Sequence, residues 1–258
     1  SGCSRLRKGD AVWADLGKTT LTGGFVQLGA WAEYAVADES QVGLKPRSLS
    51  LQDAASLPLV GLTDYQALQK TGAPWANRSD FTVVVTSGSG GTGTVAVQMA
   101  RAFGASRVIT AASPSHFALL KGLGATDVID YHKGTIWESL AKDSVDVVYD
   151  NYGAPGTADA AMPALKAGGV FIFLPGKSGD VSKHPKPGVK QINYGLCDSS
   201  RHEGVDALAA LAEAGKLRAV VQERYGLEDV LLALNASFRG HAVGKVGIDV
   251  AREPVAMV

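Results

Sequence analysis

The feature that most constrains the fold is an alternation of strand-like and helix-like segments between residues 81 and 200. Five apolar runs of strand length occur there, and helical spacing follows each of the first four. Strands that alternate with helices in this way predict βαβ units and a parallel sheet. Uninterrupted apolar strands also predict a sheet that is buried on both faces. The runs are residues 81–86, 107–111, 127–131, 145–149 and 170–174.

A glycine-rich turn, Thr86 to Gly93, joins the first of these strands to a helix that the sequence predicts over residues 94–103. It contains the pattern G-x-G-x-x-G at Gly88, Gly90 and Gly93. The pattern alone is weak, but a position between a buried strand and a helix is the context that a dinucleotide-binding turn requires. There, Gly88 allows the bend, Gly90 lets a pyrophosphate approach the backbone, and Gly93 permits close packing. A Gly/Ser turn without a ligand is the alternative.

The end of the second strand indicates which dinucleotide would bind. An NAD-selective site places an acidic residue about 20 residues after the glycines, but residues 111–116 (AASPSH) contain no carboxylate. Their small side chains leave room for a 2′-phosphate, with Ser113 as donor and His116 as a partial cation. Tyr131, at the end of the third strand, would close the same pocket. We therefore predict a preference for NADPH; an exposed His116 and simple packing of Tyr131 are the alternatives.

Composition argues against several other classes of protein. The 25 Lys and Arg residues balance 25 Asp and Glu residues, which argues against a nucleic-acid-binding surface and against a polybasic membrane anchor. No apolar run approaches the ~18 residues that cross a bilayer. Cys3 and Cys197 are the only cysteines. They exclude a disulfide framework and a four-cysteine zinc lobe, and they suit a reducing compartment.

The two ends of the chain have a different sequence pattern. Short strand-like segments separated by Gly and Pro precede residue 60, and strand-like segments occur again after residue 219, on both sides of a helical segment. We expect strands over residues 10–14, 24–28, 31–36, 220–224 and 246–250, and helices over residues 51–71, 205–214 and 227–237.

Six segments follow one another in the order seen in medium-chain dehydrogenases/reductases. They are residues 29–35 (GAWAEYA), 54–68 (AASLPLVGLTDYQAL), 87–93 (SGSGGTG), 123–131 (LGATDVIDY), 149–153 (YDNYG) and 239–245 (RGHAVGK). The chain thus resembles this family over essentially its whole length. Within the family it is similar to the zinc-free, quinone-oxidoreductase-like subgroup, and its later segments resemble the mitochondrial reticulon-interacting oxidoreductases.

The resemblance implies an α/β fold with two domains. A Rossmann dinucleotide-binding domain with a doubly wound parallel sheet would occupy residues 66–214. A partial GroES-like, β-rich substrate domain would comprise residues 1–65 and 215–258. Because Ser1 matches a position well inside that domain in relatives, we expect the first part of the family's length to be missing. Trp31 and Tyr34 are expected as core aromatics. Two cysteines cannot supply the ligands of the zinc-dependent members, so we predict no metal.

The resemblance also implies, position by position, which residues hold the cofactor. Thr63 would lie near the nicotinamide and is the candidate catalytic residue; a hydroxyl packed within the connecting helix is its alternative. The full set of expected cofactor-binding residues is Thr63, Ser89, Gly90, Gly91, Thr92, Gly93, Ser113, His116, Tyr131, Asn151, Leu174, Gly176, His241 and Lys245.

These implications predict an NADPH-dependent oxidoreductase that reduces a small-molecule quinone or α,β-unsaturated carbonyl by hydride transfer. One alternative is a catalytically weak or inactive family member that serves as a structural subunit of a larger assembly. Another is an enoyl-reductase module of a larger synthase. The compartment would be reducing, either the cytoplasm or the matrix of an organelle such as a mitochondrion or chloroplast.

Residues 191–197 (QINYGLC) are predicted as the last strand of the sheet, with apolar side chains that alternate and no charge or proline to block the edge. An unprotected edge strand tends to pair, so we predict a homodimer that joins two sheets across a two-fold axis. The alternatives are an edge shielded by residues 177–190 and an edge occupied by a different protein.

Overall fold

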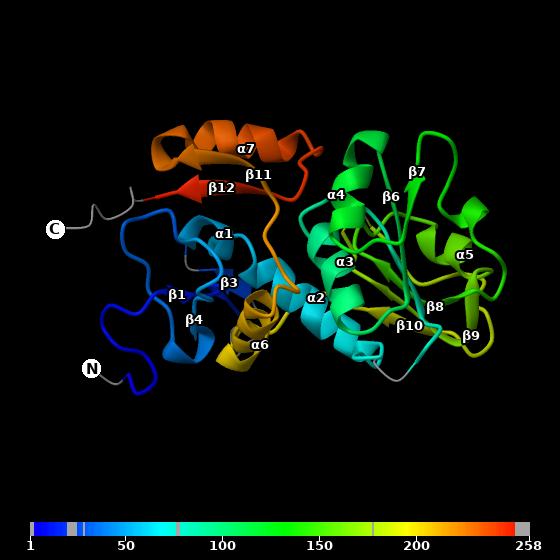
Figure 1. Cartoon of the computed structure of the whole chain (residues 1–258), viewed down its shortest axis with the longest axis horizontal. Coiled ribbons are helices and arrows are strands. Elements are labelled where there is room, and N and C mark those ends of the chain that lie inside the picture. The colour runs from blue at the N-terminus through cyan, green and yellow to red at the C-terminus, as the bar shows by residue number, and fades with distance from the viewer. Residues whose placement is uncertain (1–2, 20–24, 28, 76–77, 177, 251–258) are drawn as a thin grey trace. The chain divides into compact units, whose positions relative to one another are not determined.

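The structure, a computed structural model, describes residues 3–19, 25–27, 29–75, 78–176 and 178–250. The chain divides into two compact units. The first unit contains residues 1–63 and 197–258, and the second contains residues 64–196. Helix α2 (Pro58–Lys70) begins in the first unit and ends in the second. Figure 1 labels the elements of both units.

The second unit is built on a six-stranded parallel sheet with the order β10-β9-β8-β5-β6-β7. The chain moves outward from β5 to β7 and then returns to the other side of β5, so β5 and β8 flank a topological switch point. This arrangement confirms the predicted doubly wound parallel sheet. Its strands are β5 (Thr82–Val85), β6 (Arg107–Ala112), β7 (Asp127–Asp130), β8 (Val145–Asp150), β9 (Leu165–Phe173) and β10 (Lys190–Asn193).

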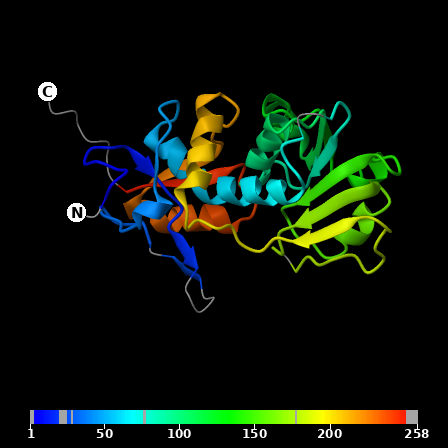
Figure 2. The ribbon, with the colours of Figure 1, turned by 90° about the horizontal axis from the view of Figure 1, so that it is seen from below.

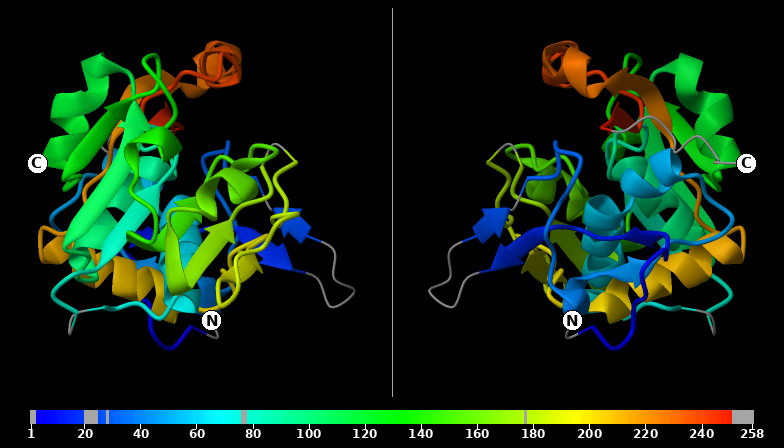
Figure 3. Two further views of the ribbon diagram at one scale, coloured as in Figure 1. Left: turned by 90° about the vertical axis from the view of Figure 1, so that its right-hand side faces the viewer. Right: turned by 90° about the vertical axis from the view of Figure 1, so that its left-hand side faces the viewer.

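Helices cover both faces of this sheet (Figure 3). Helices α3 (Gly93–Ala102) and α4 (Phe117–Gly122) connect β5 to β6 and β6 to β7, and α5 (Thr157–Ala161) connects β8 to β9. The 3₁₀ turn η2 (Pro114–His116) lies in the connection from β6 to β7, and η3 (Trp137–Ser139) lies in the connection from β7 to β8. The four residues of β5 are all buried, as a central strand covered on two faces requires.

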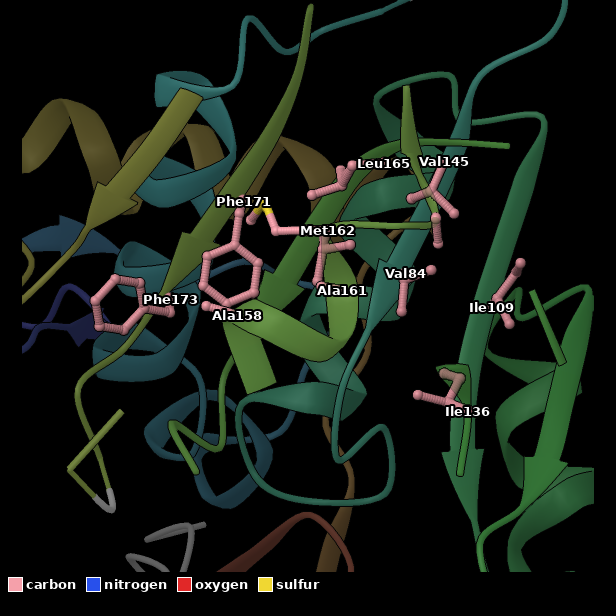
Figure 4. Packing of buried hydrophobic residues seen from close by; sticks show 12 residues of the cluster. Val84, Ile109, Ile136, Val145, Ala158, Ala161, Met162, Leu165, Phe171 and Phe173 are labelled. Atoms are coloured by element: carbon pink, nitrogen blue, oxygen red, sulfur yellow. The ribbon is translucent and has the colours of Figure 1, made fainter. Parts of the chain in front are cut away.

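One buried cluster of the second unit lies between α5 and the sheet. Ala158, Ala161 and Met162 from α5 and its C-terminal end pack with buried side chains of the strands, including Val84 and Phe171 (Figure 4). Fully burying a side chain of valine or phenylalanine size stabilises a fold by about 1.5–3 kcal/mol. The small residues of α5 allow the helix to approach the sheet closely, and the larger strand side chains fill the remaining space.

The described residues of the first unit form three two-stranded sheets. Strand β1 pairs with β4 and β2 with β3, both antiparallel, while β11 and β12 are parallel. Helix α7 packs on the β11–β12 pair (Figure 3). The elements are β1 (Val12–Trp13), β2 (Gly17–Thr19), β3 (Phe25–Gln27), η1 (Glu39–Gln41), β4 (Gly43–Leu44), α1 (Leu51–Ala55), α6 (His202–Glu213), β11 (Val221–Gly226), η4 (Leu227–Asp229), α7 (Val230–Phe238) and β12 (Lys245–Asp249).

The expectations for residues 31–36 are wrong. The segment forms no strand, and the side chains expected in the core are exposed, with 54% of Trp31 and 88% of Tyr34 accessible to solvent. The alternating pattern suited a strand, but a strand also needs a hydrogen-bonded neighbour. Among the described residues, none pairs with this segment.

Two boundaries also differ from the sequence analysis. The helix expected over residues 51–71 is two helices, α1 and α2, and the second begins at Pro58, a residue that fits a helix start because it lacks an N–H. Helix α6, expected within residues 66–214 of the Rossmann domain, packs instead on β4 and η1 of the first unit. The side chain of Leu208 in α6 packs against Gly61, at the place that a Cβ of residue 61 would occupy.

Strand β10 lies at one edge of the six-stranded sheet (Figure 2). It ends at Asn193, before Tyr194, which the sequence analysis counted among the strand's apolar side chains. Tyr194 is only 9% exposed, and its hydroxyl donates to Gln66 Oε1 at 2.8 Å. Because Tyr194 packs within its own unit, replacing it would test the stability of that unit rather than pairing with a second chain.

Candidate functional site

The glycine-rich turn closes β5 and opens α3, as predicted. A Cβ at Gly88 would lie 2.1 Å from Thr110 Oγ1, and one at Gly93 would lie 2.1 Å from the carbonyl oxygen of Ser87. Both glycines are therefore required by packing. A Cβ at Gly90 would meet only the Ser87 carbonyl oxygen, at 3.4 Å. The space in front of Gly90 is open, which suits the approach of a ligand to the backbone.

The N-terminus of α3 lies directly after this turn. The Gly90 N–H donates to the carbonyl oxygen of Ser87 at 3.0 Å, and the Thr94 N–H donates to that of Gly90 at 2.9 Å. Thr92 is the N-cap residue, and its side chain makes no capping hydrogen bond. The N-terminal end of a helix carries a partial positive charge, so this end of α3 is suited to a phosphate.

Polar side chains meet where β6 and β7 end. Ser113 Oγ lies 2.7 Å from Tyr131 Oη and 3.3 Å from His132 Nε2. The rings of Tyr131 and His132 lie 4.3 Å apart between centroids. His116 is linked to this corner through its backbone, since its N–H donates to the Ser113 carbonyl oxygen at 2.9 Å. The structure thus brings together Ser113 and Tyr131, as the sequence analysis expected, and adds His132.

The turn after β8 is held by Asp150, which is 1% exposed. Asp150 Oδ1 accepts from Thr86 Oγ1 at 2.7 Å and from the Tyr152 and Gly153 N–H groups at 3.2 and 3.1 Å. The N–H of Asn151 donates to Thr86 Oγ1 at 3.1 Å. This network fixes the Asn151 backbone between the ends of β5 and β8.

The Asn151 side chain has an unmet hydrogen-bond donor. Its Nδ2 is buried and has no hydrogen-bond partner among the residues that the structure describes. A buried amide left unpaired costs about 1–3 kcal/mol.

The turn after β9 lies against the same loop, because a Cβ at Gly153 would be 2.2 Å from the Leu174 carbonyl oxygen and 2.7 Å from the Gly176 nitrogen. Leu174 and Gly176 therefore lie against the loop that begins at Asn151.

Three other expected site residues belong to the first unit. Thr63 Oγ1 donates to the Leu59 carbonyl oxygen at 2.8 Å, which is the packing role within the helix that was the alternative to catalysis.

The Cys197 Sγ lies 3.8 Å from Asp15 Oδ2. Burial raises the pKa of the Cys197 thiol to about 11; the nearby Asp15 carboxylate acts in the same direction, whereas the Thr63 hydroxyl opposes the shift.

His241 and Lys245 lie in and just after the loop that precedes β12. His241 is exposed, and the Lys245 N–H donates to the Val220 carbonyl oxygen at 2.9 Å. Lys245 also lines a cavity of about 560 Å³ within the first unit. Trp31 and Leu59 form apolar parts of its wall, and Asp15, which is 5% exposed, contributes a carboxylate.

Sequence reasoning missed His132 and Asp15. The spacing of the βαβ units placed Tyr131 at the end of a strand, and His132 is the next residue, so the signal was available. Asp15 follows a two-residue strand in a region without periodicity, and no pattern singled it out.

Within the described residues, no group of three or more His, Cys, Asp or Glu side chains could hold a metal ion. No helix in those ranges is both long enough and apolar enough to cross a lipid bilayer.

Comparisons with known proteins agree with this architecture. Residues 123–246 match the family model described as "Zinc-binding dehydrogenase". The chain is 34% identical over 246 residues to a 2-methylene-furan-3-one reductase of Solanum lycopersicum, and 32% identical over 249 residues to a chloroplastic NADPH-dependent alkenal/one oxidoreductase of Arabidopsis thaliana. It is 31% identical over 277 residues to the mitochondrial NAD(P)H oxidoreductase RTN4IP1 of Homo sapiens. The matches cover 94%, 95% and 95% of this chain.

The solved structure of the quinone oxidoreductase from Coxiella burnetii is similar throughout, with a TM-score of 0.77 and 26% identity over 97% of this chain and 75% of that one. In sequence and in fold the chain is thus similar to medium-chain dehydrogenases/reductases, as the six segments indicated. The chain spans 58%, 59% and 65% of the length of the three curated proteins named above.

Proposed function

We propose that the chain is an NADPH-dependent reductase that passes hydride to a quinone or an α,β-unsaturated carbonyl compound. The observation that carries the proposal is the turn at Gly90, where a strand, an open approach to the backbone and the N-terminus of a helix coincide. The names of the relatives support it, since they include an NADPH-dependent alkenal/one oxidoreductase and a 2-methylene-furan-3-one reductase.

The residues at the carboxyl ends of β5 to β9 fit a dinucleotide. The pyrophosphate would bind along the turn, where backbone N–H groups and the α3 N-terminus offer positive partial charge. The residues in this role are Ser89, Gly90, Gly91, Thr92 and Gly93. Ser113, His116 and Tyr131 would surround the 2′-phosphate. Asn151 Nδ2 would donate to the ribose or nicotinamide and so satisfy its orphaned hydrogen, beside Leu174 and Gly176.

The first unit would supply the substrate's surroundings. Bound NADPH supplies the hydride. The cavity lined by Trp31 and Leu59 provides an apolar surface for an unsaturated ring or chain, while the Lys245 ammonium provides a hydrogen-bond donor for its oxygen atoms. We propose His241 and Lys245 as residues near the cofactor. We leave the catalytic proton donor unassigned, because the Thr63 hydroxyl is used within the helix.

The experiment that tests the proposal is a titration with NADPH followed by turnover. NADPH fluorescence is expected to saturate on titration, and absorbance at the nicotinamide band is expected to fall when a quinone or an enal is added. Binding without oxidation of NADPH by any quinone or enal would instead support a structural subunit that retains the dinucleotide fold. The absence of NADPH binding would contradict both functions.

Compartment and association remain proposals too. The names of two relatives place those proteins in chloroplasts and mitochondria, and we propose a reducing organelle matrix or stroma for this chain as well. We propose a homodimer through the edge of β10, where Ile192 is half-buried and the strand has a single described neighbour, β9. A monomer at micromolar concentration in sedimentation would contradict the homodimer.

A further inference from the structure

Helix α7 (Val230–Phe238) of the first unit is apolar on two sides. One side packs on β11 and β12, and its Ala233 is 3% exposed (Figure 1). On the other side, 71% of Leu231, 55% of Leu232 and 83% of Phe238 are accessible to solvent. A helix that is apolar all round is typical of a covered position, so the exposed side of α7 has the composition of a contact surface.

The exposed side chains form one continuous surface. An α-helix has 3.6 residues per turn, so Leu231 and Phe238, which are seven residues apart, point in nearly the same direction. Asn235 is also exposed and lies between them, with Leu232 beside Leu231. We call these four residues the outer face of α7. Single exposed apolar residues are ordinary, whereas a cluster of them marks a site of interaction.

The charges at the two ends of α7 have opposite signs. Glu228 and Asp229 lie in η4, directly before the helix, and Arg239 directly follows it. All three residues are exposed. Two such helices that lie side by side and antiparallel place the acidic end of each against the basic end of the other, whereas parallel helices place like charges together. The charge pattern of α7 is therefore complementary to a second, antiparallel copy of itself.

We propose that the outer face of α7 is a docking surface for a second copy of this chain, with the two α7 helices antiparallel across a two-fold axis. A two-fold contact uses the same patch on both copies, so Leu231 of each copy faces Phe238 of the other. Asn235 lies near the middle of the helix and faces its own counterpart, and two amides can exchange hydrogen bonds. The inference does not depend on the proposed function, and it concerns a surface other than the edge of β10.

The contact is expected to be weak. A helix of nine residues is about 13.5 Å long, which is short for a stable interface that buries about 800 Å² on each partner. We therefore expect the α7 contact to form at a protein concentration of about 100 μM and to be absent at about 1 μM, as for a transient complex.

The first test traps the contact as a disulfide, using the full chain at about 100 μM. Asn235→Cys is made with Cys3→Ser, which removes the exposed native thiol. On oxidation with diamide it is expected to give a covalent dimer on a non-reducing gel, because residue 235 lies near the two-fold axis. Ser237→Cys with Cys3→Ser is the matched control. Residue 237 is exposed on the same helix but lies about 200° around it from residue 235, so it should not cross-link.

The second test measures the association of variants by sedimentation equilibrium from about 5 to 200 μM. Phe238→Glu is expected to weaken the association seen at high concentration about tenfold or more, because it sets a charge against apolar side chains. Arg239→Glu should also weaken it, whereas Arg239→Lys should retain it. Leu51→Glu is the matched control, since Leu51 is an exposed leucine of α1 in the same unit, and it should change nothing. Circular dichroism establishes that each variant is folded.

Three results would overturn the inference. The first is the absence of a cross-link in Asn235→Cys, or equal cross-linking of Asn235→Cys and Ser237→Cys. The second is association of folded Phe238→Glu that matches the wild type. The third is co-sedimentation of the wild-type chain, but not of Phe238→Glu, with phosphatidylcholine vesicles, because a bilayer surface and not a second copy would then cover the outer face of α7.

Discussion

The two units of the chain bury their strands in different ways. The second unit has one six-stranded sheet whose strands come from a continuous stretch of sequence, and its central strand is buried throughout. The first unit has three two-stranded sheets and combines residues from both ends of the chain. Its hydrogen bond from Ser199 Oγ to the Gly17 carbonyl oxygen, at 2.5 Å, joins residues 182 positions apart.

This difference shows where a candidate site can be inferred from sequence. In the second unit the expected site residues lie in the loops that follow β5 to β9, so local order positions them. In the first unit the expected site residue Lys245 bonds to the distant Val220, and large apolar side chains such as Tyr34 and Phe238 are exposed. Changes in the second unit are therefore expected to have the larger effects.

The largest effect is expected at the glycine-rich turn. Gly90→Val should leave the protein folded, because the Cβ position is open, and should weaken NADPH binding about 100-fold or more, equivalent to about 2.7 kcal/mol. Gly93→Val should prevent normal folding, because its Cβ would lie 2.1 Å from a carbonyl oxygen. Circular dichroism and an NADPH titration of both variants separate the roles. Unchanged NADPH affinity in Gly90→Val would show that the turn is structural only.

The second prediction compares the unfolding free energy lost when a buried phenylalanine is replaced with that lost when an exposed one is replaced. Phe173 in β9 is fully buried, whereas Phe238 at the end of α7 is 83% exposed. Phe173→Ala is expected to cost about 3–5 kcal/mol of unfolding free energy, and Phe238→Ala less than about 0.5 kcal/mol. Urea unfolding measures both. Similar costs for the two variants would mean that Phe238 is covered in solution.

The two cysteines test burial within the first unit. Burial raises the pKa of the Cys197 thiol to about 11, whereas Cys3 is exposed. Since the thiolate is the reactive form, iodoacetamide at pH 8 should modify Cys3 and leave Cys197 intact until the protein is unfolded. Mass spectrometry of peptides gives the result. Rapid alkylation of Cys197 in the native state would mean that this part of the unit opens.

The smallest effect is expected at the edge strand β7. Arg107 Nε lies 2.9 Å from Asp127 Oδ2, and this hydrogen bond is the main reason that the pKa of Asp127 is lowered. A lowered acid pKa stabilises the fold above the unfolded-state value and loses its effect as pH falls through the folded-state value. Because both side chains are partly exposed, Arg107→Gln should cost about 1 kcal/mol or less at pH 7. A loss above about 2 kcal/mol would contradict this description of a surface pair.

Much of the second unit followed from local pattern. The apolar runs predicted β5 to β9, and the turn at Gly88 to Gly93 followed from its place between a strand and a helix. The Ser113–Tyr131 contact was foreseen because parallel strands end at one edge. Neither the orphaned Nδ2 of Asn151 nor the contact of His132 with Ser113 could be predicted, since both depend on side-chain orientation.

The first unit was predicted less well, for a physical reason. Residues 31–36 have the alternation of a strand, but pairing between distant segments decides whether a strand forms. Helix α6 has ordinary helical periodicity, which does not reveal that it packs on β4. Thr63 was a reasonable catalytic candidate by position, and its hydrogen bond to the Leu59 carbonyl oxygen is a local alternative that sequence leaves open.

We propose that the carboxyl ends of the second unit's strands form a site for NADPH. The most direct measurement is calorimetric titration of the wild-type chain with NADPH and, separately, with NADH at pH 7.0. Saturable binding of one NADPH per chain and weaker binding of NADH are expected, because no carboxylate stands at residues 111–116 and Tyr131 lies beside Ser113. No binding of either nucleotide, or tighter binding of NADH, would contradict it.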